Sequence, residues 1–193
     1  MPYKDKQKQK ESQFKWYLRN KSQVDARTQQ GRLEKKQYIA NVKSQHACTC
    51  GEDDFVCKDF HHCTGKKEFK ISAAIRLYGL RKIKRELAKC EVLCANCHRK
   101  KHKNDNKPIT KNEKRIRNRA FVLEYRLAHP CIKCNERDPY CLDFHHIHGK
   151  DIDIRRATCD CGLKRLQEEI AKCIVLCANC HRKEHHRLKN ETV

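Results

Sequence analysis

The stretch from residue 88 to residue 102 reads AKCEVLCANCHRKKH, and it returns from residue 171 to residue 185 as AKCIVLCANCHRKEH. Only two of these fifteen positions differ. The tetrapeptide Asp-Phe-His-His lies upstream of each copy, at residues 59–62 and 143–146. A stretch this rich in cysteine and histidine, present twice at a spacing of 83 residues, predicts a tandem repeat of one small metal-binding module.

The length and composition fit two small modules. The chain has 193 residues, and 38% of them are hydrophobic. Each copy covers roughly 60 to 70 residues, a size at which hydrophobic burial alone is marginal and a structural metal is often needed. We therefore expect an α+β fold made of small, zinc-stabilised modules. The expected divisions are a basic arm over 1–44, a first module over 45–103, a linker and basic helix over 104–128, a second module over 129–188 and a tail over 189–193.

The 15 cysteines indicate metal ligands rather than disulfides. The sequence shows no apolar N-terminal stretch typical of a signal peptide and no apolar run long enough to cross a membrane. We therefore expect a cytoplasmic protein, in the host cytoplasm if a phage encodes it, with no membrane partner. In that compartment, CxxC spacings with histidines nearby are typical of metal sites.

The formal net charge of +21 predicts a polyanionic partner. If eight thiolates bind two Zn²⁺ ions, a net charge of about +17 remains. Such an excess in a small protein favours nucleic acid as the partner. A solvated basic surface without a dedicated partner is the alternative, and an anionic membrane surface is less favoured because no helix pairs a strongly apolar face with its basic one.

Two segments outside the repeats are predicted to be helical and basic. Residues 1–45 hold twelve Lys or Arg against four Asp or Glu, with low complexity and expected disorder over residues 1–12 and a helix break at Gly31. Residues 104–108 have the composition of a linker. The segment 114–127 predicts a helix with an apolar face, formed by Ile116, Ala120, Leu123 and Leu127.

Each copy offers two cysteine pairs for a structural zinc ion. The second copy has Cys131 and Cys134 followed by Cys177 and Cys180, and two CxxC turns of this kind present four thiolates to one tetrahedral ion. The first copy offers Cys50, Cys94 and Cys97, and its fourth ligand is Cys48 or His46, with Cys48 favoured although the resulting CxC is one residue tighter.

The histidines form a second constellation in each copy. Adjacent histidines are expected on a short strand, and two more lie four residues apart on the final helix, where they share one face. These residues are His61, His62, His98 and His102 in the first copy and His145, His146, His181 and His185 in the second. The set can hold a divalent ion between strand and helix and leave one histidine as a base. A second zinc site without catalysis and buried structural histidines are the alternatives.

A His-His pair followed by Val-Leu-Cys-Ala-Asn-Cys-His-Arg and a further histidine resembles the HNH endonuclease family, in its zinc-containing branch with a ββα-metal finger, also called a His-Me finger. The resemblance covers two tandem copies. It implies a phosphodiester hydrolase acting on DNA, of a compact kind found in phages, mobile elements and restriction systems. His62 and His146 would be general bases. His61, His98, His102, His145, His181 and His185 would bind the catalytic ion, with Mg²⁺ or Mn²⁺ expected, and Asp59 and Asp143 would orient a histidine.

The resemblance has one departure. Many members carry a bracing asparagine where this chain has Lys89 and Lys172, and the nearest asparagines are Asn96 and Asn179, in a different register. These asparagines are assigned a supporting role beside the metal. Arg99 and Arg182 follow the motif histidines and are expected to bind the scissile phosphate, with ordinary solvated surface as the alternative.

Two copies in one chain predict a monomeric pseudo-dimer with one site for each DNA strand. The main alternative is a zinc-dependent nucleic-acid-binding protein on the same scaffold without activity. A zinc-stabilised adaptor for an acidic protein partner is a third possibility.

Overall fold

The computed structural model describes residues 5–103 and 112–191, so the linker predicted at 104–108 lies outside the described residues. The fold is α+β, with two small two-stranded sheets. The chain divides into two compact units, Met1–Val42 with His62–Cys90, and Lys43–His61 with Glu91–Val193. The segment 62–90 therefore groups with the N-terminal arm and not with the rest of the first copy.

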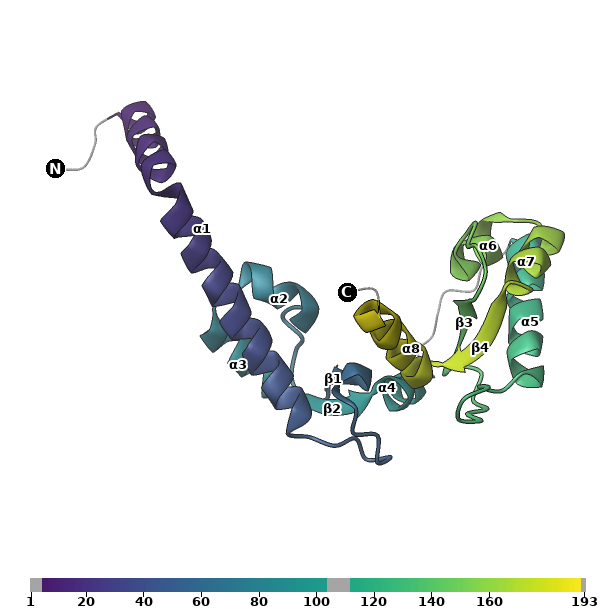
Figure 1. Cartoon of the computed structure of the whole chain (residues 1–193). Helices are drawn as coiled ribbons and strands as arrows, with labels where there is room; N and C mark the ends of the chain where they lie inside the picture. Colours follow the sequence, from purple (N-terminus) through teal and green to yellow (C-terminus); the bar gives the residue numbers. More distant parts are fainter. Residues whose placement is uncertain (1–4, 104–111, 192–193) are drawn as a thin grey trace. The chain divides into compact units, whose positions relative to one another are not determined.

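The N-terminal arm is a single helix, α1 (Lys6–Ser44), which runs without interruption (Figure 1). The predicted break at Gly31 and the predicted disorder over residues 6–12 are both wrong. Lysine, glutamine, arginine and glutamate dominate this segment, and they are good helix formers, whereas one glycine costs only about 1 kcal/mol. None of the described residues of α1 is buried.

Two short helices of the first unit contact α1. These are α2 (Ile71–Leu77) and α3 (Leu80–Leu87), with Ala74 and Ile83 fully buried. The ammonium of Lys35 donates hydrogen bonds to the carbonyls of Ile75 and Tyr78, at 2.8 and 3.3 Å. These contacts explain why residues 62–90 cluster with the arm.

Each copy carries a two-stranded sheet followed by a helix. In the first copy, β1 (Lys58–His62) is preceded by a turn of 3₁₀ helix, η1 (Phe55–Cys57), and pairs with β2 (Cys90–Cys94), which leads into α4 (Ala95–Lys101). In the second copy, β3 (Leu142–His146) pairs antiparallel with β4 (Cys173–Cys177), which leads into α8 (Ala178–Glu191). The expected strands are confirmed, but the final helices begin three residues before the predicted histidines, because the second cysteine pair forms their first turn. The tail predicted at 189–193 is helical as far as Glu191.

The core of the second copy is enclosed by three further helices, α5 (Glu113–Ala128), α6 (Ile154–Asp160) and α7 (Leu163–Ile170). The sequence did not predict α6. Fully buried members of this core include Leu142, Leu166 and Leu176.

The helix α5 was predicted, but its apolar face was assigned wrongly. Ile116, Leu123 and Leu127 are exposed, at 49%, 46% and 63%, and Ala120 is exposed as well. The buried face carries Val122 and the fully buried Asn118, and the Asn118 amide donates hydrogen bonds to the carbonyls of Thr158 and Cys161 at 3.2 and 2.9 Å. A buried polar side chain therefore sets the orientation of α5. Across the described residues, none of the helices combines the length and apolar character needed to span a membrane.

Candidate metal centres

The four-cysteine sets predicted for zinc come together in both copies. In each set the sulfur atoms lie within 4.8 Å of one another, and the sets are Cys48, Cys50, Cys94, Cys97 and Cys131, Cys134, Cys177, Cys180. The sulfurs of Cys50 and Cys94 are 3.6 Å apart, and those of Cys134 and Cys177 are 3.5 Å apart. A tetrahedral zinc ion with Zn–S distances near 2.3 Å places its sulfurs about 3.8 Å apart. Both clusters therefore fit structural zinc.

The fourth member of the first cluster is Cys48 and not His46. The tighter CxC turn keeps the hydrogen bonds of the longer one. Cys48 donates its N–H to the Glu52 carbonyl and accepts one from Gly51, at 3.1 and 2.8 Å, and Cys131 does the same with Glu136 and Asn135. Gly51 adopts a φ of +86°, which a glycine reaches without steric cost. The turn at Cys48 is one residue shorter, but the backbone of Cys48 makes the same hydrogen bonds as that of Cys131.

Neighbouring groups perturb the thiols of the first cluster in opposite directions. Burial raises the pKa of Cys48, but hydrogen bonds from the backbone of Cys50 and Cys94 and from the neighbouring thiols outweigh it and lower the pKa to about 6. Burial raises the pKa of Cys97 well above its usual range, and the neighbouring thiols raise it further. The first thiolate of the cluster is therefore favoured at Cys48.

Three of the four histidines of each copy converge, so the predicted metal ligands are brought together. In the second copy the ring nitrogens of His145, His181 and His185 lie within 4.8 Å of one another. His145 comes from β3, and the other two lie one turn apart on α8. In the first copy His61 from β1 meets His98 and His102, with ring centroids 5.0 to 5.2 Å apart.

Two observations indicate that these rings suit a bound cation. The Nδ1 atoms of His61 and His145 are buried and have no hydrogen-bond partner among the described residues. The Nε2 atoms of His181 and His185 are 3.0 Å apart, close to the roughly 3.3 Å expected for two nitrogens on one tetrahedral zinc ion. Burial lowers the pKa of His145, and the positive charges of its two neighbours lower it further, which favours the neutral form that binds metal.

The donor set narrows the choice of ion. An all-imidazole set suits Zn²⁺ or Ni²⁺, whereas Mg²⁺ and Mn²⁺ prefer oxygen ligands. The donor set therefore does not favour either of the two ions expected from the sequence.

The histidines predicted to act as bases have a partner that the sequence analysis missed. His146 Nε2 lies 2.9 Å from Glu169 Oε1, and His62 Nε2 lies 2.9 Å from Glu86 Oε1. Both glutamates are buried, although carboxylates rarely are. A carboxylate can only accept, so each Nε2 carries the proton and each Nδ1 retains its lone pair.

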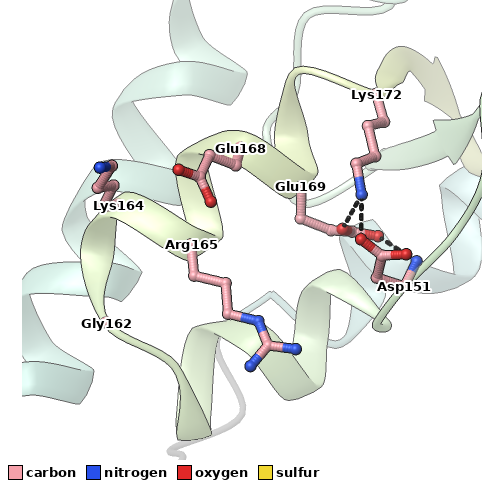
Figure 2. Close-up of a pocket in the computed structure, with 7 residues that line it drawn as sticks. All are labelled: Asp151, Gly162, Lys164, Arg165, Glu168, Glu169 and Lys172. Carbon is pink, nitrogen blue, oxygen red and sulfur yellow. Dashed lines mark hydrogen bonds and ion pairs between the residues drawn. The ribbon is translucent and has the colours of Figure 1, made fainter.

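The same glutamates are also held by Lys89 and Lys172. Glu169 accepts hydrogen bonds from the Lys172 ammonium at 2.9 Å and from the backbone N–H of Asp151 at 3.0 Å (Figure 2). It also accepts one from the backbone N–H of Ile152 at 3.2 Å. Burial raises the pKa of Glu169, but these donors and His146 outweigh it and hold the pKa at about 2. Lys172 thus holds the glutamate that binds the backbone of the loop after β3. The repeated Glu-x-x-Lys, at 86–89 and 169–172, was the available signal.

Asp59 and Asp143 lie behind the metal-site histidines, as predicted. Asp143 Oδ2 is 3.4 Å from His181 Nδ1, and Asp59 Oδ2 is 3.6 Å from His98 Nδ1. Burial raises the pKa of Asp143, but hydrogen bonds from His181 and Arg99 and the charge of Arg99 bring it to about 2. Each carboxylate is therefore an ionised acceptor for the outer nitrogen of a ligand histidine.

The two arginines expected at the phosphate have different partners. Arg99 donates two hydrogen bonds to Asp143, at 3.0 and 2.8 Å, and Arg182 donates to Asp59 at 2.7 Å. Phosphate binding by these arginines stays a prediction, but each guanidinium is already held by a carboxylate of the other copy.

Asn96 and Asn179 bind each other, so a supporting role beside the metal stays a prediction. Both are buried, and each amide oxygen accepts the backbone N–H of the other asparagine, at 3.2 and 3.3 Å. Asn96 lies in the first turn of α4 and Asn179 in the first turn of α8. Their mutual hydrogen bonds therefore join the two copies.

The histidine cluster of the second copy opens into a cleft of about 1060 Å³. Its lining combines the cluster with His146 and with cationic side chains, which are Arg119, Arg126, Lys150 and Arg155. Arg119 and Arg126 belong to the predicted basic helix, whereas Lys150 and Arg155 were not predicted because they come from the loop after β3 and from the unpredicted α6.

Comparison of the chain with models of protein families, with curated proteins and with solved structures finds no match.

Proposed function

We propose that the protein is a metal-dependent endonuclease that hydrolyses phosphodiester bonds in DNA, with one site in each copy. The observation that carries the proposal is the cleft of the second copy, where three convergent histidines, His146 and four cationic side chains line one cavity. A phosphodiester needs a base for water, charge neutralisation and help for the leaving oxygen, and this lining contains a group for each task.

His146 would act as the base. Its Nδ1 would take a proton from water as the water oxygen attacks phosphorus, while Nε2–H remains bonded to Glu169 and stabilises the imidazolium. The P–O bond to the leaving oxygen breaks, and that oxygen takes a proton from solvent. A divalent ion held by His145, His181 and His185 would stabilise the negative charge that develops on the phosphate and the leaving oxygen.

The cations of the cleft would bind the DNA backbone. Arg119, Lys150 and Arg155 line the same cavity as the histidines, and the chain has a net charge of +21. The exposed arm α1 supplies further lysines and arginines. DNA affinity should accordingly fall steeply as salt rises.

The test is cleavage of supercoiled plasmid with Mn²⁺, Ni²⁺, Zn²⁺ or Mg²⁺ added to zinc-loaded protein. Wild type should linearise the plasmid, His62→Ala and His146→Ala should each only nick it, and the double variant should be inactive. His148→Ala is the matched control, because this exposed histidine lies two residues from His146 and outside the clusters. Cleavage that survives in the double variant would refute the proposed base.

A non-catalytic nucleic-acid-binding protein is the second candidate. It is favoured by the two four-cysteine clusters and the exposed basic helix α1, which suffice for binding without any role for the histidines. Folded, DNA-bound protein that cuts no substrate with any of the four ions would support this candidate.

A further inference from the structure

The two copies meet along a seam of reciprocal contacts. Several contacts between the first and the second copy are repeated with the roles exchanged, as in an isologous dimer interface. The pairs are Asn96 with Asn179, Arg99 with Asp143 and Arg182 with Asp59, Lys100 with Glu136 and Lys183 with Glu52, and the thiols of Cys57 and Cys141 with the carbonyls of Asn179 and Asn96.

Two of these contacts reach the histidine clusters. Arg99, on α4 of the first copy, donates a hydrogen bond to each carboxylate oxygen of Asp143. Asp143 Oδ2 in turn lies 3.4 Å from Nδ1 of His181. The opposite nitrogen of the same ring, Nε2, is the one that lies 3.0 Å from His185. The chain of contacts therefore runs from an arginine of one copy, through a carboxylate, to a ligand histidine of the other.

In the mirror contact the arginine donates a single hydrogen bond to the carboxylate. Arg182, on α8, donates to Asp59 and to the carbonyl of Cys57, at 2.7 and 3.1 Å, and Asp59 Oδ2 lies 3.6 Å from Nδ1 of His98. A carboxylate behind a ligand histidine fixes its tautomer and orientation, and losing such a partner typically costs 10- to 100-fold in metal affinity. The two parallel hydrogen bonds from Arg99 fix the direction of the Asp143 carboxylate as well as its charge.

We propose that the two histidine clusters are braced in trans, so that Arg99 positions the cluster of the second copy and Arg182 positions the cluster of the first. Both arginines are positioning residues that contact no ligand atom of the ion. The inference rests on the histidine clusters being metal sites, but it does not depend on nuclease activity.

The test measures Ni²⁺ affinity by calorimetry on protein whose cysteine clusters are filled with zinc, as checked by zinc content. One background, His181→Ala with His185→Ala, leaves only the first cluster, and the other, His98→Ala with His102→Ala, leaves only the second. Arg182→Met should weaken the first cluster 10- to 100-fold and leave the second unchanged, and Arg99→Met should do the opposite.

Lys100→Met and Lys183→Met are the matched controls, because each removes a seam ion pair from the same helix without touching an aspartate. They should leave Ni²⁺ affinity unchanged, and Arg99→Lys should restore part of what Arg99→Met loses. The proposal is overturned if Arg99→Met weakens the cluster of its own copy, if the lysine variants weaken Ni²⁺ binding equally, or if wild type binds no Ni²⁺. Crossed effects in a protein that cleaves nothing would uphold the bracing and refute only the nuclease.

Discussion

The first copy should depend on its zinc ion almost entirely, and Cys97→Ser tests this. The buried apolar cluster around the site has four members, and two of them, Cys48 and Cys94, are themselves cluster cysteines. Leu93 is the one large apolar side chain among them, and burying a leucine contributes about 1.5–3 kcal/mol. A structural zinc site contributes about 10–16 kcal/mol in apparent terms. Losing the zinc ion would therefore remove more stabilising free energy than the local packing supplies. That amount is comparable to the entire stability of an ordinary domain, about 5–15 kcal/mol.

We therefore expect Cys97→Ser to lower the zinc content from two ions per chain to one. Hydrogen exchange over residues 46–61 and 91–102 should rise to the rate of unfolded chain, while the core enclosed by α5, α6 and α7 stays protected. Cys90→Ser is the control, because Cys90 lies outside the cluster, at the start of the strand β2 that leads into α4. Two zinc ions and unchanged protection in Cys97→Ser would refute the reasoning.

Three further predictions concern the second copy. Leu142→Ala, at a fully buried position, should lower the free energy of unfolding by about 2–5 kcal/mol in urea titrations, and a loss below 1 kcal/mol would mean that the core is packed differently. Ile116→Gln should change that free energy by less than about 0.5 kcal/mol, whereas Val122→Ala on the buried face should cost clearly more. Because the pKa of Glu169 is lowered to about 2, its contribution to stability is complete above pH 4.5 and is lost only as the pH falls through about 2. The ¹³C shift of its carboxylate should therefore stay constant between pH 7 and 4.5, with the exposed Glu168 as the internal reference, and a midpoint near 4.5 for Glu169 would show that its contacts do not form.

The parts of the fold that follow local spacing were predictable from the sequence. The cysteine clusters depend on CxxC turns. The strand pairs follow from the two-residue repeat of side chains on a strand, and the pairing of His181 with His185 follows from the 3.6-residue repeat of a helix. All three patterns are visible in one copy. Each of these sequence patterns occurs again in the other copy.

Features that depend on tertiary partners were not predictable in the same way. The buried face of α5 is set by Asn118, whose acceptors lie about 40 residues away, and an apolar pattern cannot reveal them. Glu86 and Glu169 looked like ordinary helix surface because burial of a carboxylate depends on donors from a distant loop. The partners of Arg99 and Arg182 belong to the other copy, which spacing within one copy does not report.

The reciprocal seam also constrains how the sequences of the two copies can diverge. A change at one seam position alters a contact with the other copy, so it must be matched there, whereas a change elsewhere is free of that constraint. The two positions at which the fifteen-residue copies differ obey this rule, since they lie off the seam. In the first copy they hold Glu91 and Lys101, which form an ion pair at 3.2 Å, and in the second they hold Ile174 and Glu184, where Glu184 pairs instead with Lys133 and Arg187. Both differences therefore change contacts within one copy, and the residues of the reciprocal seam pairs are identical in the two copies.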